Sequence, residues 1–220
     1  MENNERRKAL LAMIAAPVGV AACATAEGGA HAGGGHHNHA QLLADLQGRL
    51  DVAESRTAIS ETLFRYARAN DRADEAMMRD CFWPESQHKH GRFEGTSQDF
   101  VTYAVRVVTN LKFAAHHLSN VSIEINGDRA FSECHYFAHH RRNVANTTDR
   151  EEDAFFEGRY IDIHERRDGV WKIIRRRGVS DFNSPVIPAT ALFADWTPGH
   201  SEHAPNDAYY QIRQDFLAGS

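Results

Sequence analysis

The first regular pattern along the chain is a helical one. Apolar residues recur every three or four positions at Leu42, Leu46, Leu50, Ile59, Leu63, Phe64 and Ala67. This spacing predicts a helix from about residue 42 to residue 70. A second, short helix is predicted around Met77 and Met78, ending near Pro84. The segment 96–113 predicts a third helix with Thr96 or Ser97 as its N-cap.

Strand patterns follow from residue 113 onward. The segment 113–125 reaches Asn126-Gly127-Asp128, a strong hairpin signal, and the segment 129–142 returns. The segments 154–167 and 170–182 predict a second hairpin around Asp168-Gly169. The remainder, 185–220, is rich in proline and ends in a weakly helical stretch, so we expect an arm that lies on the domain or on a neighbour.

Three helices followed by antiparallel strands indicate an α+β fold. We expect a cone-shaped, curved antiparallel sheet wrapped around three helices, an α+β barrel with an interior pocket. This domain is assigned to residues 42–184. About 135 residues are enough to bury roughly two thirds of the surface of the unfolded chain.

The net charge of −5 and the sequence pI of about 6.3 argue against a nucleic-acid partner, which a basic face would recognise. No apolar run reaches the roughly 18–20 residues that span a bilayer. The charged start and the apolar run from Ala9 to Val20 indicate a secretory signal over residues 1–26. We therefore expect an exported, periplasmic or lipid-anchored bacterial protein, cytoplasmic if this segment is not a signal.

Two cysteine questions stay open at this point. Val20 to Cys23 resembles the lipid-attachment motif of bacterial lipoproteins, so a lipid on Cys23 would be the only membrane contact, and ordinary cleavage after Ala26 competes with it. Cys81 and Cys134 would pair in an oxidising compartment, but we favour two buried thiols.

Residues 27–41 form a Gly/His-rich segment predicted to be a linker. Four of its histidines are candidate loose ligands of a transition metal, but we expect this to be incidental: His31, His36, His37 and His39. His88 and His90 would form a zinc site with His135 or His164, yet no Cys or carboxylate spacing supports one. We predict neither metal nor cofactor.

Two adjacent histidines stand in the first predicted strand. Neighbouring strand residues point to opposite faces of a sheet, so His116 and His117 cannot both serve one site. We expect His116 to face the interior of the cone and His117 to face away from it.

Four stretches together resemble the SnoaL-like family of the nuclear-transport-factor-like fold, over about residues 52–183. They are ISETLFRYARANDRADEAMMRDCFWPES, HKHGRFEGTSQDFV, HHLSNVSIEINGDRAFSE and GRYIDIHERRDGVWKIIRR. The family contains polyketide cyclases, dehydratases, dehydrohalogenases, isomerases and members without catalysis. The resemblance therefore implies the fold more strongly than any one reaction.

The resemblance to lyases of the family implies a catalytic set. Asp71 at the end of the first helix, His116 four residues before Asn120, and Arg176 after the DGVWK hairpin match their pattern. A second histidine on the returning strand corresponds to His140, with His139 as a rival. A tyrosine found beside the aspartate in dehydratases is replaced by Asn70. Candidate substrate-binding residues are Tyr66, His90, Phe113 and Tyr136.

Elementary chemistry supports the pair independently. A neutral imidazole is a competent base near pH 7, and a carboxylate on its other nitrogen fixes the tautomer and stabilises the imidazolium. Plainer interpretations exist: Asp71 as an N-cap, His116 as a core histidine, and Arg176 as part of a solvated basic strand. Strand alternation separates Arg176 from Arg175 and places it on one face with Ile174.

These observations predict a cofactor-independent lyase of the dehydratase or elimination type, acting on a bulky apolar or aromatic small molecule. A double-bond isomerase, a cyclase or a deformylating carbon–carbon lyase would use the same base. The alternatives of another class are a non-catalytic exported ligand-binding protein and a partner subunit like the small subunit of aromatic-ring dioxygenases. Self-association is expected, a trimer more than a dimer.

Overall fold

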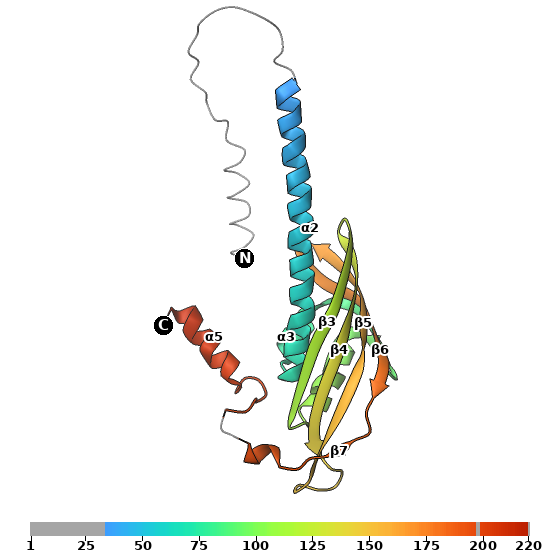
Figure 1. Cartoon of the computed structure of the whole chain (residues 1–220), viewed down its shortest axis with the longest axis vertical. Coiled ribbons are helices and arrows are strands. Elements are labelled where there is room, and N and C mark those ends of the chain that lie inside the picture. The colour runs from blue at the N-terminus through green and yellow to red at the C-terminus, as the bar shows by residue number, and fades with distance from the viewer. Residues whose placement is uncertain (1–33, 197–198, 220) are drawn as a thin grey trace, which may run out of the picture. The chain divides into compact units, whose positions relative to one another are not determined.

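A computed structural model describes residues 34–196 and 199–219 of the chain, with the side chains described from residue 38 (Figure 1). The chain divides into two units, Met1–Ala44 and Asp45–Ser220. The predicted signal over residues 1–26, Cys23 and His31 lie outside the described residues. None of the described helices is both long enough and apolar enough to cross a membrane.

The described helices are α2 (Gly34–Asp71), α3 (Glu75–Asp80), α4 (Ser97–Val108) and α5 (Ala208–Ala218), with a short 3-10 turn at Phe193–Asp195. The three helices predicted for the domain are confirmed. Helix α2 begins earlier than expected, so residues 34–41 of the predicted linker are helical. No proline interrupts the chain there, and good helix formers such as Ala40 and Leu42 let the helix extend.

Seven strands form one sheet. They are β1 (Phe82–His90), β2 (Phe93–Thr96), β3 (Phe113–Asn126), β4 (Arg129–Asn143), β5 (Glu151–Arg167), β6 (Val170–Asn183) and β7 (Ile187–Pro188). The order is β2-β1-β6-β5-β4-β3, and β7 pairs with β5. Both predicted hairpins are confirmed, and Asp168 and Gly169 take the positive φ angles that a tight turn requires.

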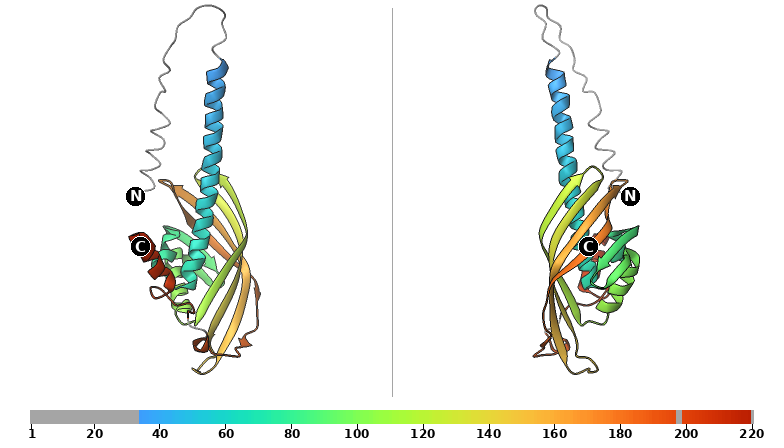
Figure 2. Two further views of the ribbon diagram at one scale, coloured as in Figure 1. Left: turned by 60° about the vertical axis from the view of Figure 1, so that its left-hand side comes forward. Right: turned by 90° about the vertical axis from the view of Figure 1, so that its right-hand side faces the viewer.

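The predicted α+β fold, with a curved sheet packed against helices, is confirmed. The sheet is curved but open, because it ends at the four-residue β2 on one side and at β3 on the other. Figure 2 shows α3 and α4 on one side of this curved sheet. Strand β1, which the sequence pattern did not predict, pairs in parallel with β6. The register shifts between Phe82 and Gln87, around Pro84, which has no N–H for a ladder hydrogen bond.

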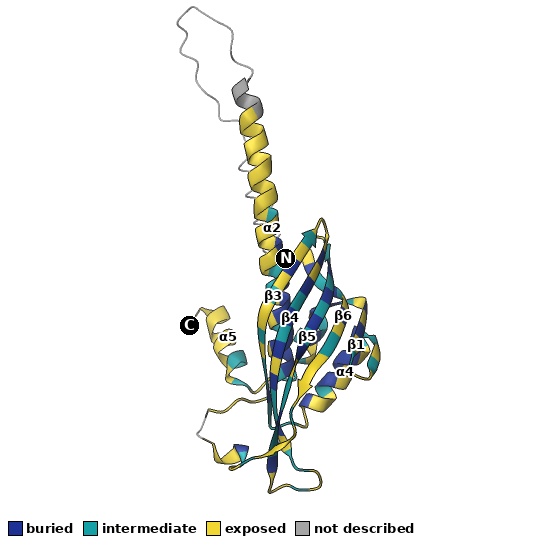
Figure 3. Cartoon of the chain, turned by 45° about the vertical axis from the view of Figure 1, so that its right-hand side comes forward, coloured by how far each residue is buried: buried dark blue, intermediate teal, exposed yellow. Residues whose placement is uncertain are grey.

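The core lies between the sheet and the helices. Figure 3 shows buried residues running along β4 and β5. A continuous cluster joins residues of α2, α3, α4 and the sheet, among them Leu63, Tyr66, Met78, Phe100, Tyr136 and Tyr160. Cys81 and Cys134 belong to this cluster as free, buried thiols, as favoured from the sequence. The lower-numbered leucines of α2, Leu42 to Leu50, are exposed.

An ion pair is buried in this core. The Arg176 guanidinium donates from Nε and Nη2 to the two carboxylate oxygens of Asp162, at 2.8 and 2.6 Å. Both side chains have 0% exposure. The guanidinium also lies 4.2 Å from the ring centre of Tyr66 and 4.3 Å from that of Tyr160. Bidentate hydrogen bonds and two aromatic faces compensate for the loss of water around the charge.

A β-bulge decides which arginine is buried. Between Ile163 and His164 the pairing of β5 with β6 shifts by one residue, so Asp162 faces Arg176 rather than Arg175. The buried neighbour of Arg176 on its own strand is consequently Ile173, and the predicted grouping with Ile174 is wrong. Regular alternation cannot anticipate such a shift.

Removing the Asp162 carboxylate tests how much the stability of the core depends on the Arg176–Asp162 pair. We expect Asp162→Ala to lower the free energy of unfolding by about 3–5 kcal/mol, because it leaves a buried cation without a partner. Urea unfolding followed by circular dichroism measures this. Asp181→Ala, which breaks the exposed Arg159–Asp181 pair, is the matched control and should change stability little. Equal effects of the two substitutions would contradict the interpretation.

Candidate active site

Asp71 and His116 are in direct contact. The carboxylate Oδ1 of Asp71 lies 2.6 Å from Nδ1 of His116. The His116 side chain is 6% exposed and that of Asp71 is 21% exposed. The acceptor at Nδ1 requires a proton there, which leaves the lone pair of a neutral ring at Nε2. The contact predicted from the sequence is therefore present, in a geometry suited to a general base.

Two elements position this pair. Asp71 is the last residue of α2, and His116 lies on the edge strand β3, which pairs with β4. Asn70, just before the carboxylate, has its amide Nδ2 3.4 Å from Nε2 of His116. The side-chain oxygen of Asn70 is buried and has no hydrogen-bond partner. The two ring nitrogens of His116 are thus contacted by two consecutive residues at the C-terminal end of α2.

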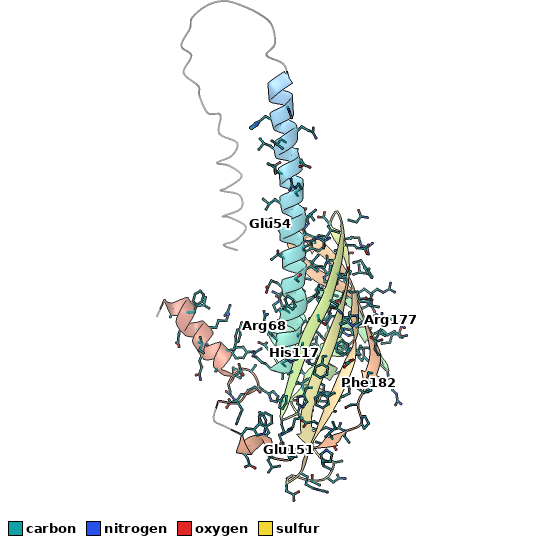
Figure 4. All side chains as sticks on the ribbon, viewed as in Figure 1. Glu54, Arg68, His117, Glu151, Arg177 and Phe182 are labelled. Carbon is teal, nitrogen blue, oxygen red and sulfur yellow. The ribbon has the colours of Figure 1, made fainter. Side chains whose placement is uncertain are left out.

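A recess of about 310 Å³ reaches His116 from outside. Its walls are Phe64, Ala67, Arg68, His116, His117 and Leu118, from α2 and β3. Arg68 and His117 mark this side of the molecule in Figure 4. His117 is exposed while His116 is mostly covered, in line with their expected opposite orientations. This recess leads to His116 between α2 and the edge strand β3.

His140 lies beside His116 and its rival His139 does not. The rings of His116 and His140 have centres 5.5 Å apart, and Nε2 of His140 is buried without a partner. Burial, and then the positive charge of a protonated His116, lower the pKa of His140 to about 3. His139 points to the other face of the sheet, where its Nε2 contacts Asp153 at 2.7 Å.

His90 and His88 form a second group of buried imidazoles. Burial, the charge of Arg176 and that of a protonated His116 lower the pKa of His90 to about 4. Burial first, then Arg176 and His90, lower the pKa of His88 to about 2. The His90 ring lies against Gly178, where an added Cβ would come within 2.6 Å of it. Both imidazoles are therefore neutral near pH 7.

Arg176 does not touch His116, but one of its nitrogens is uncommitted. Nε and Nη2 are used by Asp162, whereas Nη1 is buried without a hydrogen-bond partner. Burial acts against the charge of the Arg176 guanidinium, but the Asp162 carboxylate more than offsets this effect, so the pKa of Arg176 is raised. The plain interpretation of a solvated basic strand is wrong for this residue. Any role in chemistry would have to come from Nη1 alone.

The predicted aromatic substrate contacts are mostly core residues. Tyr66 is 1% exposed, and its burial raises the pKa of the hydroxyl to about 12. Tyr136 stacks on Tyr160 at 4.6 Å between ring centres. Phe113 packs instead against His139, at 4.8 Å, and against the aromatic rings of the C-terminal arm. Tyr66 and Tyr136 thus belong to the buried core cluster rather than to the walls of the recess.

Sequence reasoning missed two contributors. Asp162 is not singled out by it, although an acidic residue on a buried strand face is a signal of a buried partner. Asn70 is identified only as a replacement for a tyrosine, not as a contact of His116. Phe64, one of the aromatic residues available for a pocket, lines the recess. Within residues 38–196 and 199–219, no group of three or more His, Cys, Asp or Glu side chains is arranged to hold a metal ion.

Comparison with known proteins places this geometry in context. The family model of the SnoaL-like domain matches residues 51–177. A hexachlorocyclohexane dehydrochlorinase from Novosphingobium barchaimii is similar in structure, with 19% identity, a TM-score of 0.55, and coverage of 66% of this chain and 96% of that one. A second dehydrochlorinase of this kind has 20% identity, a TM-score of 0.57 and coverage of 69% and 99%.

A candidate scytalone dehydratase from Novosphingobium aromaticivorans is also similar. It has 19% identity, a TM-score of 0.54, and coverage of 70% of this chain and 96% of that one. At these identities the likeness establishes the fold. A comparison with curated protein sequences gives no match.

The buried imidazoles predict an acid-sensitive fold. In an unfolded chain His88 takes up a proton below about pH 6.5, whereas in the folded protein its pKa lies at about 2. The stability that this neutral ring contributes is complete above pH 6.5 and is lost as the pH falls below that value, by about 1.4 kcal/mol per pH unit. Between pH 6 and 4.5, His88→Phe should reduce the slope of the free energy of unfolding against pH by about 1.4 kcal/mol per pH unit. Urea unfolding at several pH values tests this, and unchanged slopes would contradict it.

Proposed function

The chain belongs to the SnoaL-like family, and on that premise we propose that it is a cofactor-independent lyase of the elimination type. Its substrate would be a bulky apolar or aromatic small molecule with a hydroxyl or halide leaving group. The observation that carries this proposal is the 2.6 Å contact between Asp71 and His116, together with the position of His116 in the wall of a recess.

In the proposed reaction, Nε2 of His116 removes a proton from the carbon next to the one that bears the leaving group. The electrons of the broken C–H bond form the new double bond, and the leaving group departs with its bonding pair. Asp71 accepts the hydrogen bond from Nδ1 and stabilises the imidazolium as it forms. The imidazolium then returns its proton to the released hydroxide or to solvent.

One further group would act on the developing negative charge: Nε2 of His140, whose ring centre lies 5.5 Å from that of His116, is buried without a partner. The Arg176 side chain has 0% exposure and does not line the recess, so we assign it to the core. The neutral state of His140 near pH 7 suits it to hydrogen bonding rather than to carrying a full proton. Donors fixed in advance, in a site with little water, are worth more than the same groups in solution.

The recess supports an apolar or aromatic substrate. Phe64, Ala67 and Leu118 supply most of its apolar wall, and its volume is at the lower end of the range for small-molecule sites. We therefore assign substrate contacts to these residues rather than to Tyr66, Tyr136 and Phe113. Isomerisation, cyclisation and deformylating cleavage would begin with the same proton abstraction, and the products distinguish them.

His116→Gln should lower kcat about 10²- to 10⁴-fold for the best compound of a panel of hydroxylated and halogenated aromatics, because it removes the base. Asp71→Asn should lower kcat by a similar factor, since it removes the charge that stabilises the imidazolium. Mass spectrometry detects loss of water or of hydrogen halide from the substrate.

His135→Gln is the matched control, because it changes a histidine on β4 that does not line the recess, and it should leave kcat within a factor of about two. Circular dichroism confirms that each variant is folded. If the wild-type protein binds compounds of the panel but converts none of them, or if His116→Gln turns over at the wild-type rate, the lyase proposal fails. A non-catalytic binding protein would then be favoured.

A further inference from the structure

The described part of the C-terminal arm, residues 185–196 and 199–219, is tied to the domain at two separate places. At the first, β7 pairs with β5, and the backbone N–H of Phe193 donates to Oε2 of Glu151 at 2.8 Å. The Arg141 guanidinium lies 4.9 Å from the ring centre of Trp196. These contacts anchor the beginning of the arm at one end of the sheet.

At the second place, the arm contacts the turn that follows Asp71. Nε of Arg72 donates to Oδ1 of Asp207 at 3.1 Å, and the hydroxyl of Tyr210 donates to Oδ2 of Asp74 at 2.6 Å. The backbone N–H of Ala204 donates to the carbonyl of Arg72 at 2.7 Å. Figure 2 shows α5 next to this end of α2.

These contacts are well shielded. The side chains of Arg72 and Asp207 are 25% and 13% exposed, and the guanidinium of Arg72 also lies 5.1 Å from the ring centre of Tyr209. Burial raises the pKa of Asp207, but the N–H groups of Glu202 and Tyr209, and then Arg72, outweigh it, so the pKa stays below its ordinary value. Burial, and then Asp74, raise the pKa of Tyr210. Near pH 7 the carboxylate is charged and the phenol is a donor.

Two features of the turn after Asp71 make it unfavourable unless other contacts stabilise it. Asp71 stands at the C-terminal end of a helix, where the macrodipole disfavours a negative charge by about 0.3–1 kcal/mol. Ala73 has a φ of +52°, an uncommon conformation for a residue with a Cβ. The one partner that the structure shows for the Asp71 side chain, in the described part of the chain, is His116.

We propose that Asp207 and Tyr210 of the arm are positioning residues for the candidate base, holding the turn Arg72–Asp74 so that the Asp71 carboxylate stays on Nδ1 of His116. This inference rests on the proposed function as far as turnover is concerned. The hydrogen bond itself is measurable without any substrate.

The test combines Tyr210→Phe, which removes one hydroxyl, with Asp207→Asn, which removes a charge but retains a side chain able to cap α5. Ring ¹⁵N and ¹H NMR of the full-length protein reports the tautomer of His116 and the exchange of its Nδ1 proton. In the double variant we expect the Nδ1-protonated form to lose its dominance and its proton to exchange at least about tenfold faster. With an active compound, kcat should fall about 10- to 100-fold while KM stays within about twofold.

Phe216→Ser is the matched control, because this α5 side chain is 77% exposed and contributes no contact to the turn. It should reproduce the wild-type tautomer, exchange rate and kcat. An unchanged His116 signal in the double variant overturns the positioning role. So does a drop in thermal midpoint with the signal intact, which indicates a purely structural arm. If no compound is converted, the lyase proposal fails, and the NMR result still decides on the arm.

Discussion

The arrangement depends on one buried interaction, the pairing of Arg176 with Asp162. It crosses from β6 to β5, and through the ring of Tyr66 the same guanidinium contacts α2. A buried cation tolerates little displacement from its carboxylate, because any gap leaves charge uncompensated. Tyr66 lies on α2, between one and two turns before Asp71. The pair that holds the core together therefore also fixes the helix end that carries the candidate carboxylate.

The same charge shapes the electrostatics of the interior. Burial, and then the charge of Arg176, lower the pKa of His88 and of His90 far enough to keep both rings neutral near pH 7. His140 is neutral mainly through burial. His116 differs from these three in having a carboxylate on Nδ1, and this contact is the reason why the proposed mechanism assigns the proton transfer to it. Because the pKa values of His88, His90 and His140 are lowered, these rings would not compete with His116 for the proton in that mechanism.

Much of the fold and the central contact of the site were predictable because local signals determine them. Helical spacing and turn residues identified the helices and both hairpins, and the family pattern placed Asp71 against His116. What failed depended on pairing between distant segments. The parallel pairing of β1 has no local signature across Pro84, and the bulge next to His164 changes which side chains accompany Arg176.

The turn Arg72–Asp74 has three structural roles. It ends α2, it begins α3 through the Asp74 carboxylate, whose Oδ1 accepts from the N–H of Met77, and it receives Tyr210 on Oδ2 of the same carboxylate. Asp74 therefore uses both oxygens and has no freedom to replace Asp71 as the partner of the base. The two aspartates of the DRAD sequence therefore have different roles. Asp74 is the N-cap of α3, whereas Asp71 is available to His116.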